Sequence, residues 1–161
     1  MRILLLTRGL PGSGKSTWIR ESGLETYTIS TDRLRLLYSA PQLGIDGAIE
    51  VSQKVNRIIF KTLVEMLETR MENGDLSVID ACHTRTADFD KYKDLVKTYR
   101  YRVVMKDFSG VGLAECKRRN MLRPELERLP EHAIDRMNRQ LSQCRVPGWI
   151  QVFSHDQKIA L

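Results

Sequence analysis

One short segment limits the folds open to this chain: residues 9–17, GLPGSGKST, directly after the apolar run of residues 3–6. Three glycines and a proline in nine residues exclude a regular helix or strand there. Residues 9–16 match the pattern GxxxxGKS/T without a mismatch, between a predicted strand and a predicted helix. Such a loop turns successive backbone N–H groups inward and forms a cradle for phosphate groups. The chain is therefore expected to fold around the phosphates of a nucleoside triphosphate.

The predicted phosphate loop combines backbone groups with two functional side chains. Lys15 places a point charge on the outer phosphates, and Ser16 offers its hydroxyl to Mg²⁺. We expect ATP or another nucleoside triphosphate, with Mg²⁺, as cofactors, and Ser16 as a metal ligand. The residues expected to bind the nucleotide are Gly9, Pro11, Gly12, Ser13, Gly14, Lys15, Ser16 and Thr17.

Buried-strand and helix patterns alternate along the rest of the sequence. The patterns predict strands at residues 2–8, 26–30, 76–79, 101–108 and 149–153, and helices at residues 14–21, 31–39, 49–71, 86–99, 111–121 and 130–144. The apolar face of the longest helix is expected to hold Val51, Val55, Ile58, Ile59, Leu63, Met66, Leu67 and Met71. We expect an α/β fold in a single domain over residues 1–161, with a central, mostly parallel sheet of about five strands and helices on both faces.

Three polar features follow the carboxyl ends of predicted strands: the loop at Gly9, Asp32 and Asp80. Ligands of parallel sheets bind at this edge, so the three are expected to converge. One helical turn beyond Asp32, Arg35 is expected on the same side of its helix. Asp32 could then take the proton of an acceptor hydroxyl while Arg35 holds an acceptor phosphate. The alternative is that Asp32 only caps its helix.

The size and composition of the chain narrow the class of protein. A length of 161 residues leaves no room for motor domains, and the guanine-reading motif N/TKxD is absent, so a small kinase is favoured. No apolar run approaches the roughly 20 residues needed to cross a bilayer. The cysteines Cys82, Cys116 and Cys144 show no metal-type spacing, which indicates reduced thiols in a cytosolic compartment.

Four segments carry a resemblance to a known family. LTRGLPGSGKSTW, DRLR, VIDA and KRRNMLR make residues 2–143 similar to the 5′-hydroxyl polynucleotide kinase module of phage and bacterial end-healing enzymes. The resemblance implies the P-loop kinase fold and ATP-dependent phosphorylation of the 5′-hydroxyl end of RNA or DNA. It also implies a cytoplasmic location in a bacterial or phage-infected cell, and a phosphatase or ligase domain or partner of the same repair pathway.

The same resemblance implies roles for individual residues. Lys15 and Ser16 handle the donor phosphates and the metal. Asp32 is the general base toward the 5′-hydroxyl, and Arg35 contacts the phosphate next to the terminal nucleoside. Asp80 supports the acceptor and metal region, so the expected acceptor-binding residues are Asp32, Arg35 and Asp80.

One departure from the family pattern follows Asp80, where Cys82 or His83 stands in place of a usual small polar residue. His83 could line the acceptor site, although a lone loop histidine is more often exposed. Cys82 is expected to be a packed thiol rather than a nucleophile.

The basic residues in excess gather in one stretch. Residues 97–145 carry 12 basic and 6 acidic side chains, which fits either a polyanion-binding surface or a solvated face. Residues 117–119 are expected to straddle a helix end, and Pro124 disfavours helix at the preceding Arg123. By the resemblance, Arg119 and Arg123 join the catalytic residues, in a lid over about residues 117–130 that closes over the donor phosphates.

Two other functions fit parts of these patterns. The first is a small-molecule P-loop kinase that acts on a nucleoside, a sugar or an antibiotic. The second is a non-catalytic nucleotide-binding module that regulates a partner. Neither needs an arginine that reads an acceptor phosphate, so Arg35 favours the polynucleotide substrate.

Overall fold

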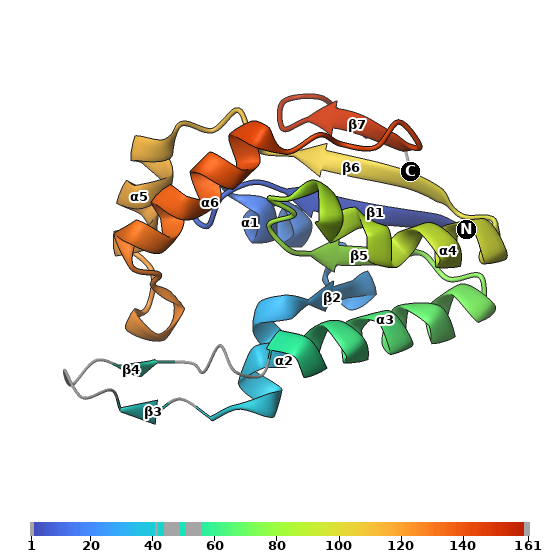
Figure 1. Cartoon of the computed structure of the whole chain (residues 1–161), viewed down its shortest axis with the longest axis horizontal. Coiled ribbons are helices and arrows are strands. Elements are labelled where there is room, and N and C mark those ends of the chain that lie inside the picture. Colours follow the sequence, from blue (N-terminus) through green and yellow to red (C-terminus); the bar gives the residue numbers. More distant parts are fainter. Residues whose placement is uncertain (1, 41, 44–48, 51–55, 160–161) are drawn as a thin grey trace.

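The computed structural model describes residues 2–40, 42–43, 49–50 and 56–159, and it confirms the α/β fold (Figure 1). The central sheet has five strands in the order β2-β5-β1-β6-β7, and every neighbouring pair is parallel. The strands are β1 (Ile3–Arg8), β2 (Thr28–Ser30), β5 (Ser77–Asp80), β6 (Arg102–Asp107) and β7 (Ile150–Ser154). Because β1 lies at the centre of this order, all six of its residues are buried. The phosphate loop therefore starts from the most enclosed strand of the sheet.

Helices cover both faces of the sheet. On one face lie α3 (Asn56–Glu72) and α4 (Asp90–Tyr99), and on the other lies α1 (Lys15–Glu21) (Figure 1). Successive side chains of a strand point to opposite faces. Leu4 and Leu6 accordingly pack beneath α3 and α4, whereas Leu5 packs against Ile19 of α1. These two layers fix β1 and α1 relative to each other, and the phosphate loop connects the end of β1 to the start of α1.

A helical pair lies beyond the carboxyl end of the sheet. It consists of α5 (Leu113–Met121) and α6 (Glu131–Gln143), with the short helix η4 (Glu125–Glu127) between them. The pair shares a small core with the phosphate loop, made of Leu10, Cys116, Ile134 and Leu141. The two helices that flank the segment expected to be a lid are therefore anchored directly on the phosphate loop.

The longest predicted helix is shorter than the pattern indicated. Ile49 and Glu50 form the strand β4 (Ile49–Glu50), antiparallel to β3 (Gln42–Leu43), and α3 begins at Asn56. Apolar spacing alone cannot reveal such a hairpin, because the pairing depends on residues elsewhere in the chain. Val51 and Val55 lie outside the described residues.

The apolar face of α3 is also narrower than predicted. Residues spaced by four turn toward the sheet and are fully buried: Ile59, Leu63, Leu67 and Met71. Ile58 and Met66 lie at the edges of that stripe and are exposed, which corrects their assignment to the buried face.

Three other boundaries differ from the prediction. The segment at 26–30 begins as a 3₁₀ turn, η1 (Glu25–Tyr27), and the helix at 86–99 begins as another, η3 (Thr86–Phe89). Residues 117–119 lie inside α5 instead of straddling its end. No helix in the described segments is long and apolar enough to span a bilayer.

Candidate functional site

The phosphate loop joins β1 to α1 and packs closely against its neighbours. Gly9, Gly12 and Gly14 have φ angles of 142°, 79° and 100°, in the region that favours glycine. A Cβ at Gly12 would lie 2.5 Å from the carbonyl oxygen of Cys116, so glycine is what lets α5 approach the loop. The Gly9 N–H donates to the Cys82 carbonyl at 3.0 Å, which ties the loop to the segment after β5.

Lys15 is buried inside the loop. Its ammonium group donates to the carbonyl oxygens of Gly9 (3.0 Å) and Leu10 (2.8 Å) and lies 3.4 Å from the Ser13 hydroxyl. An ammonium group has three N–H donors, and each has a neutral acceptor here. Phosphate oxygens would offer stronger, charge-assisted bonds to the same donors. The loop is therefore suited to exchange its own contacts for those of a nucleotide.

Ser16 and Asp80 form the pair best suited to hold a metal ion. The Ser16 hydroxyl donates to Asp80 Oδ2 at 2.8 Å, and Thr31 donates to the Asp80 carbonyl at 3.3 Å. Hydroxyl and carboxylate oxygens are ligands that Mg²⁺ takes, with phosphates and water completing its shell. Among the residues the structure describes, no group of three or more His, Cys, Asp or Glu could hold a metal. Such a group is not required here, because Mg²⁺ that is bound to phosphates needs only one or two protein ligands.

Asp32 and Arg35 lie together on the first turns of α2 (Thr31–Tyr38). The two side chains lie on the same side of the helix, as the spacing predicted, and Arg35 Nη1 donates to Asp32 Oδ1 at 2.7 Å. The N-cap of α2 is Ser30, whose hydroxyl accepts from the Arg33 N–H at 3.5 Å. The alternative role of Asp32 as the cap is therefore wrong, and its carboxylate, with 73% of the side chain exposed, can meet a substrate.

The Arg35 guanidinium is held from two sides, and one of its three nitrogens makes no hydrogen bond to the described residues. Its Nη2 donates to Asn56 Oδ1 at 3.1 Å, at the start of α3. The side chain is only 17% exposed, and its buried Nε–H has no hydrogen-bond partner among the described residues. A buried donor without a partner is costly, and a phosphate oxygen would satisfy it.

Cys82 follows β5 and is bonded through its carbonyl to the phosphate loop. Burial raises the pKa of its thiol, with smaller electrostatic effects from Lys15 and Arg123, which lower this pKa, and from Asp32 and Asp80, which raise it. The Ser16 and Thr31 bonds to Asp80 bring the phosphate loop and the start of α2 to the end of β5, two residues before Cys82. The convergence of the phosphate loop, Asp32 and Asp80 is what the strand order predicted. A thiol kept neutral is a poor nucleophile, as expected for a packed cysteine.

His83 corrects an expectation, because it is buried rather than exposed. Its Nδ1 lies 2.6 Å from the Thr7 carbonyl oxygen, and its Nε2 lies 3.0 Å from the Tyr92 hydroxyl. The ring stacks on Phe89, with the two ring centroids 5.5 Å apart. Burial lowers the pKa of His83 to about 4. The neutral ring thus donates to Thr7, accepts from Tyr92 and braces the end of β5 against β1.

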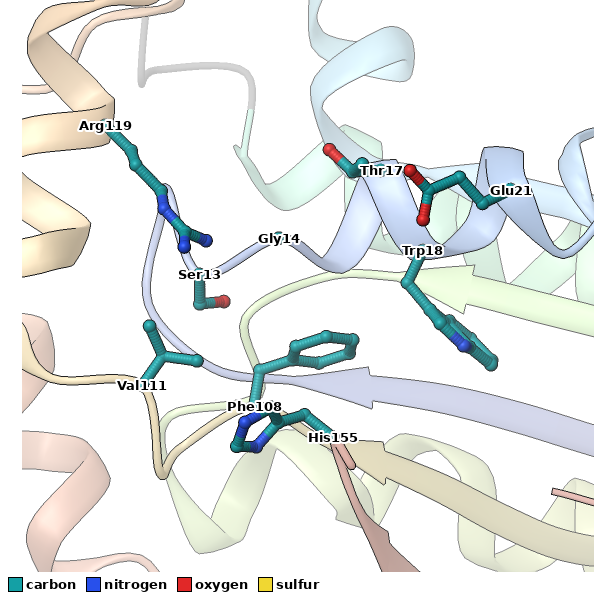
Figure 2. Close-up of a pocket in the computed structure, with 9 residues that line it drawn as sticks. All are labelled: Ser13, Gly14, Thr17, Trp18, Glu21, Phe108, Val111, Arg119 and His155. Carbon is teal, nitrogen blue, oxygen red and sulfur yellow. The ribbon is translucent and has the colours of Figure 1, made fainter. Parts of the chain in front are cut away.

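Arg119 extends over the phosphate loop from α5 (Figure 2). Its Nη1 lies 3.6 Å from the position that a Cβ at Gly14 would take. Its Nε donates to Glu115 at 2.5 Å, and Arg118 donates to the same carboxylate at 2.7 Å. Hydrogen bonds from Arg118 and then Arg119 lower the pKa of Glu115 to about 2. Glu115 therefore stays ionised and holds the Arg119 guanidinium beside the loop.

Arg123 follows α5 and lies in the loop that leads to η4. Its Nη1 donates to the Glu127 carbonyl at 2.9 Å, and its charge has a small lowering effect on the pKa of Cys82. Arg119 therefore lies beside the phosphate loop, whereas Arg123 is bonded within the loop between α5 and α6.

A cleft of about 470 Å³ opens beside the phosphate loop (Figure 2). Phe108 lies at its centre, with ring centroids 6.2 Å from those of Trp18 and His155. Flat aromatic and guanidinium surfaces suit a nucleobase. The lining residues are Ser13, Gly14, Thr17, Trp18, Glu21, Phe108, Val111, Arg119 and His155.

Sequence reasoning missed the two aromatic residues Phe108 and His155 of this cleft. Phe108 directly follows β6 and His155 directly follows β7. The rule that ligands bind beyond the carboxyl ends of parallel strands, which pointed to Asp32 and Asp80, would have found them too.

A family model described as an AAA domain matches residues 4–144 of the chain. No curated protein matches the sequence. Among solved structures, a chain in the Pnkp1/Rnl/Hen1 RNA repair complex is 26% identical, with a TM-score of 0.66, and the match covers 88% of this chain and 44% of that one. The chain therefore spans less than half the length of that relative.

Two further structures are similar over nearly the whole length of both chains. A gluconokinase from Sinorhizobium meliloti 1021 is 16% identical, with a TM-score of 0.58 and coverage of 98% of this chain and 85% of its own. Kti12 from Chaetomium thermophilum, in complex with ADP-AlF3, is 17% identical, with a TM-score of 0.61 and coverage of 96% and 90%. These likenesses show the P-loop kinase fold.

Proposed function

Because the chain belongs to the AAA domain family and has the P-loop kinase fold, we propose that it transfers the γ-phosphate of ATP, or another nucleoside triphosphate, to the 5′-hydroxyl end of RNA or DNA. The observation that carries the proposal is the ion pair between Arg35 Nη1 and Asp32 Oδ1, which lie 2.7 Å apart. A carboxylate can accept the proton of an acceptor hydroxyl. A guanidinium with an unpartnered Nε–H can bind a neighbouring phosphate. The end of a nucleic acid strand offers both groups, whereas a sugar or a nucleoside offers only the hydroxyl.

On the donor side, the phosphate loop and the aromatic cleft would hold opposite ends of the nucleotide. The phosphates would lie on the loop N–H groups and Lys15, and the base would lie in the cleft with Phe108. Ser16 and Asp80 would hold Mg²⁺, which offsets the negative charge of the phosphates when it is bound.

Transfer would then proceed in line. Asp32 accepts the proton of the 5′-hydroxyl, the oxygen forms a bond to the γ-phosphorus, and the bond to the bridging β–γ oxygen breaks to release the nucleoside diphosphate. Arg35 holds the phosphate that follows the terminal nucleoside. Arg119 and Arg123 neutralise the charge on the moving phosphoryl group, in a lid over about residues 117–130.

The proposal extends to partners. The relative with 26% identity belongs to an RNA repair complex with Rnl and Hen1. A phosphatase or a ligase that prepares or joins the same ends would be the natural companion of this chain, as a partner or as a further domain.

An acceptor comparison tests the proposed function. The protein is incubated with γ-labelled ATP and Mg²⁺ and either a 5′-hydroxyl RNA or DNA oligonucleotide, free nucleosides, gluconate or other sugars. We expect label on the oligonucleotide, none on a matched oligonucleotide that already carries a 5′-phosphate, and a steep loss of acceptor binding with salt. Faster labelling of a sugar or a nucleoside would support the small-molecule kinase instead.

A further inference from the structure

Asn120 closes the loop that carries Arg123. The side chain of Asn120, near the end of α5, is 1% exposed. Its Nδ2 donates to the Leu129 carbonyl at 2.8 Å, and its Oδ1 accepts from the Leu129 N–H at 3.1 Å. One amide therefore binds both polar backbone groups of a residue nine positions further on. The loop between α5 and α6 begins and ends at this contact.

Bonds inside the loop fix Arg123 relative to that contact. Arg123 Nη1 donates to the Glu127 carbonyl at 2.9 Å, and Arg128 Nε donates to the Arg123 carbonyl at 2.7 Å. Outside the loop, Lys117 binds Asp135 at 2.8 Å and joins α5 to α6. The sequence predicted a helix end at residues 117–119, whereas in the structure α5 continues to Met121 and the loop that follows is closed by its own hydrogen bonds.

The position of such an arginine matters more than its presence. A guanidinium that neutralises charge in a transition state is effective only when it is held to within a fraction of an ångström. An apolar residue could fill the same volume, but it would not fix the direction in which the loop leaves α5. The amide of Asn120 does so through two bonds of opposite polarity.

We propose that Asn120 is a positioning residue that sets the rate of phosphoryl transfer through Arg123. The proposal rests on the proposed function, in which Arg123 neutralises the transferring phosphoryl group. Asn120 itself is buried, and both of its side-chain polar atoms are bonded to Leu129. Its loss would let the loop leave α5 in several directions, so that Arg123 would spend only part of its time at the phosphoryl group.

A double-mutant cycle tests this role. Asn120→Ala is made in the wild-type protein and in Arg123→Ala, and kcat and KM are measured for both substrates. We expect kcat to fall about tenfold or more in the wild-type background, with the KM for ATP nearly unchanged, but less than about twofold when Arg123 is already absent. Asn138→Ala, the same change on α6 at a side chain for which the described structure shows no hydrogen bond, should leave kcat unchanged.

A second variant keeps the test decisive if Asn120→Ala does not fold. Asn120→Ser places a neutral hydroxyl there, which can replace at most one of the two bonds to Leu129, so its kcat should also fall and the fall should again depend on Arg123. All rates are measured well below the melting temperature of each variant. An equal loss of kcat in the presence and in the absence of Arg123, or no loss at all, overturns the proposal.

Failure of this inference can be told apart from failure of the proposed function. If Arg123→Ala slows transfer to an oligonucleotide and Asn120→Ala does not, only the role of Asn120 is wrong. If the wild-type protein phosphorylates another class of acceptor, the proposed function is wrong, and the same four proteins assayed on that acceptor still decide whether Asn120 acts through Arg123.

Discussion

The Ser16 hydroxyl donates to the Asp80 carboxylate at 2.8 Å, although 64 residues separate them in the chain. Ser16 lies in the first turn of α1, which leaves the phosphate loop, and Asp80 ends the strand that lies between β1 and β2. This bond therefore joins the phosphate loop to the end of β5. It depends on the strand order, because β5 is the direct neighbour of β1.

The pair predicts how the protein depends on Mg²⁺. Chelation with EDTA should abolish transfer, and Ser16→Ala should raise the Mg²⁺ concentration needed for half the maximal rate by about tenfold or more, because one of the few protein ligands is lost. Ser13→Ala, at the other serine of the loop, should not change that concentration. A titration of the rate against Mg²⁺ measures it, and equal Mg²⁺ dependence of all three proteins would rule out Ser16 as a ligand.

Asp32→Asn should lower kcat by about 10² to 10⁴, the range typical of a lost general base. The amide still accepts a bond from Arg35 but cannot take the proton of the acceptor. Since 73% of the side chain is exposed, the melting temperature and the Kd for ATP should stay near wild type. Asp94→Asn, an exposed aspartate on α4, is the control. A wild-type kcat for Asp32→Asn would exclude Asp32 as the general base. Unchanged biological activity of a variant that no longer transfers phosphate would favour the non-catalytic regulator.

Arg123→Ala should lower kcat by about 10² to 10³, since one donor to a transition-state charge contributes roughly 3–4 kcal/mol. The folded state loses little, because the guanidinium binds only one end of its own loop. Arg118→Ala removes an arginine of α5 that pairs with Glu115, and it should have a much smaller effect on kcat. Steady-state kinetics and thermal melting on both variants check this. An Arg123→Ala enzyme as fast as wild type would exclude the residue from catalysis.

His83 predicts a loss of stability in mild acid. Its pKa is about 4 in the folded protein and about 6.5 when unfolded, so the unfolded state binds more protons between these values. The free energy of unfolding should therefore fall as the pH drops below about 6.5, by about 2 kcal/mol between pH 7 and pH 5. Urea unfolding at several pH values measures the slope.

Two variants test whether His83 causes this pH dependence of the free energy of unfolding. His83→Gln should be less stable at pH 7 but should lose less stability on acidification, because the titrating group is gone. His132→Gln, at an exposed histidine of α6, should keep the wild-type slope. A His83→Gln protein with an unchanged slope would assign the acid sensitivity to other groups.

Local patterns were enough to predict much of the fold. The phosphate loop was recognised because its function demands a fixed spacing of glycine, lysine and serine. The edge where Gly9, Asp32 and Asp80 meet followed from the alternation of strands and helices, because that alternation implies a parallel sheet. The placement of Asp32 and Arg35 on one side of their helix followed from the helical repeat alone.

Features that depend on distant residues could not be predicted in this way. The burial of His83 depends on Tyr92 and on the Thr7 carbonyl of another strand. The bond from Asn120 to Leu129 closes a loop whose path no pattern reveals. Apolar spacing predicted a helix from residue 49, but Ile49 pairs with Leu43 in a short sheet and α3 begins at Asn56. The single-domain boundary at 1–161 and the lid over residues 117–130 stay predictions.

The most direct test of the account is the rate advantage that an acceptor phosphate confers through Arg35. The value of kcat/KM is measured for a nucleoside 3′-phosphate and for the same nucleoside without the phosphate, in the wild-type protein and in Arg35→Gln. We predict a wild-type preference of about 100-fold or more for the phosphorylated acceptor, because charged hydrogen bonds contribute roughly 1.5–3 kcal/mol each, and a ratio near one in the variant. A wild-type protein that phosphorylates both acceptors equally well, or prefers a sugar, would contradict the account.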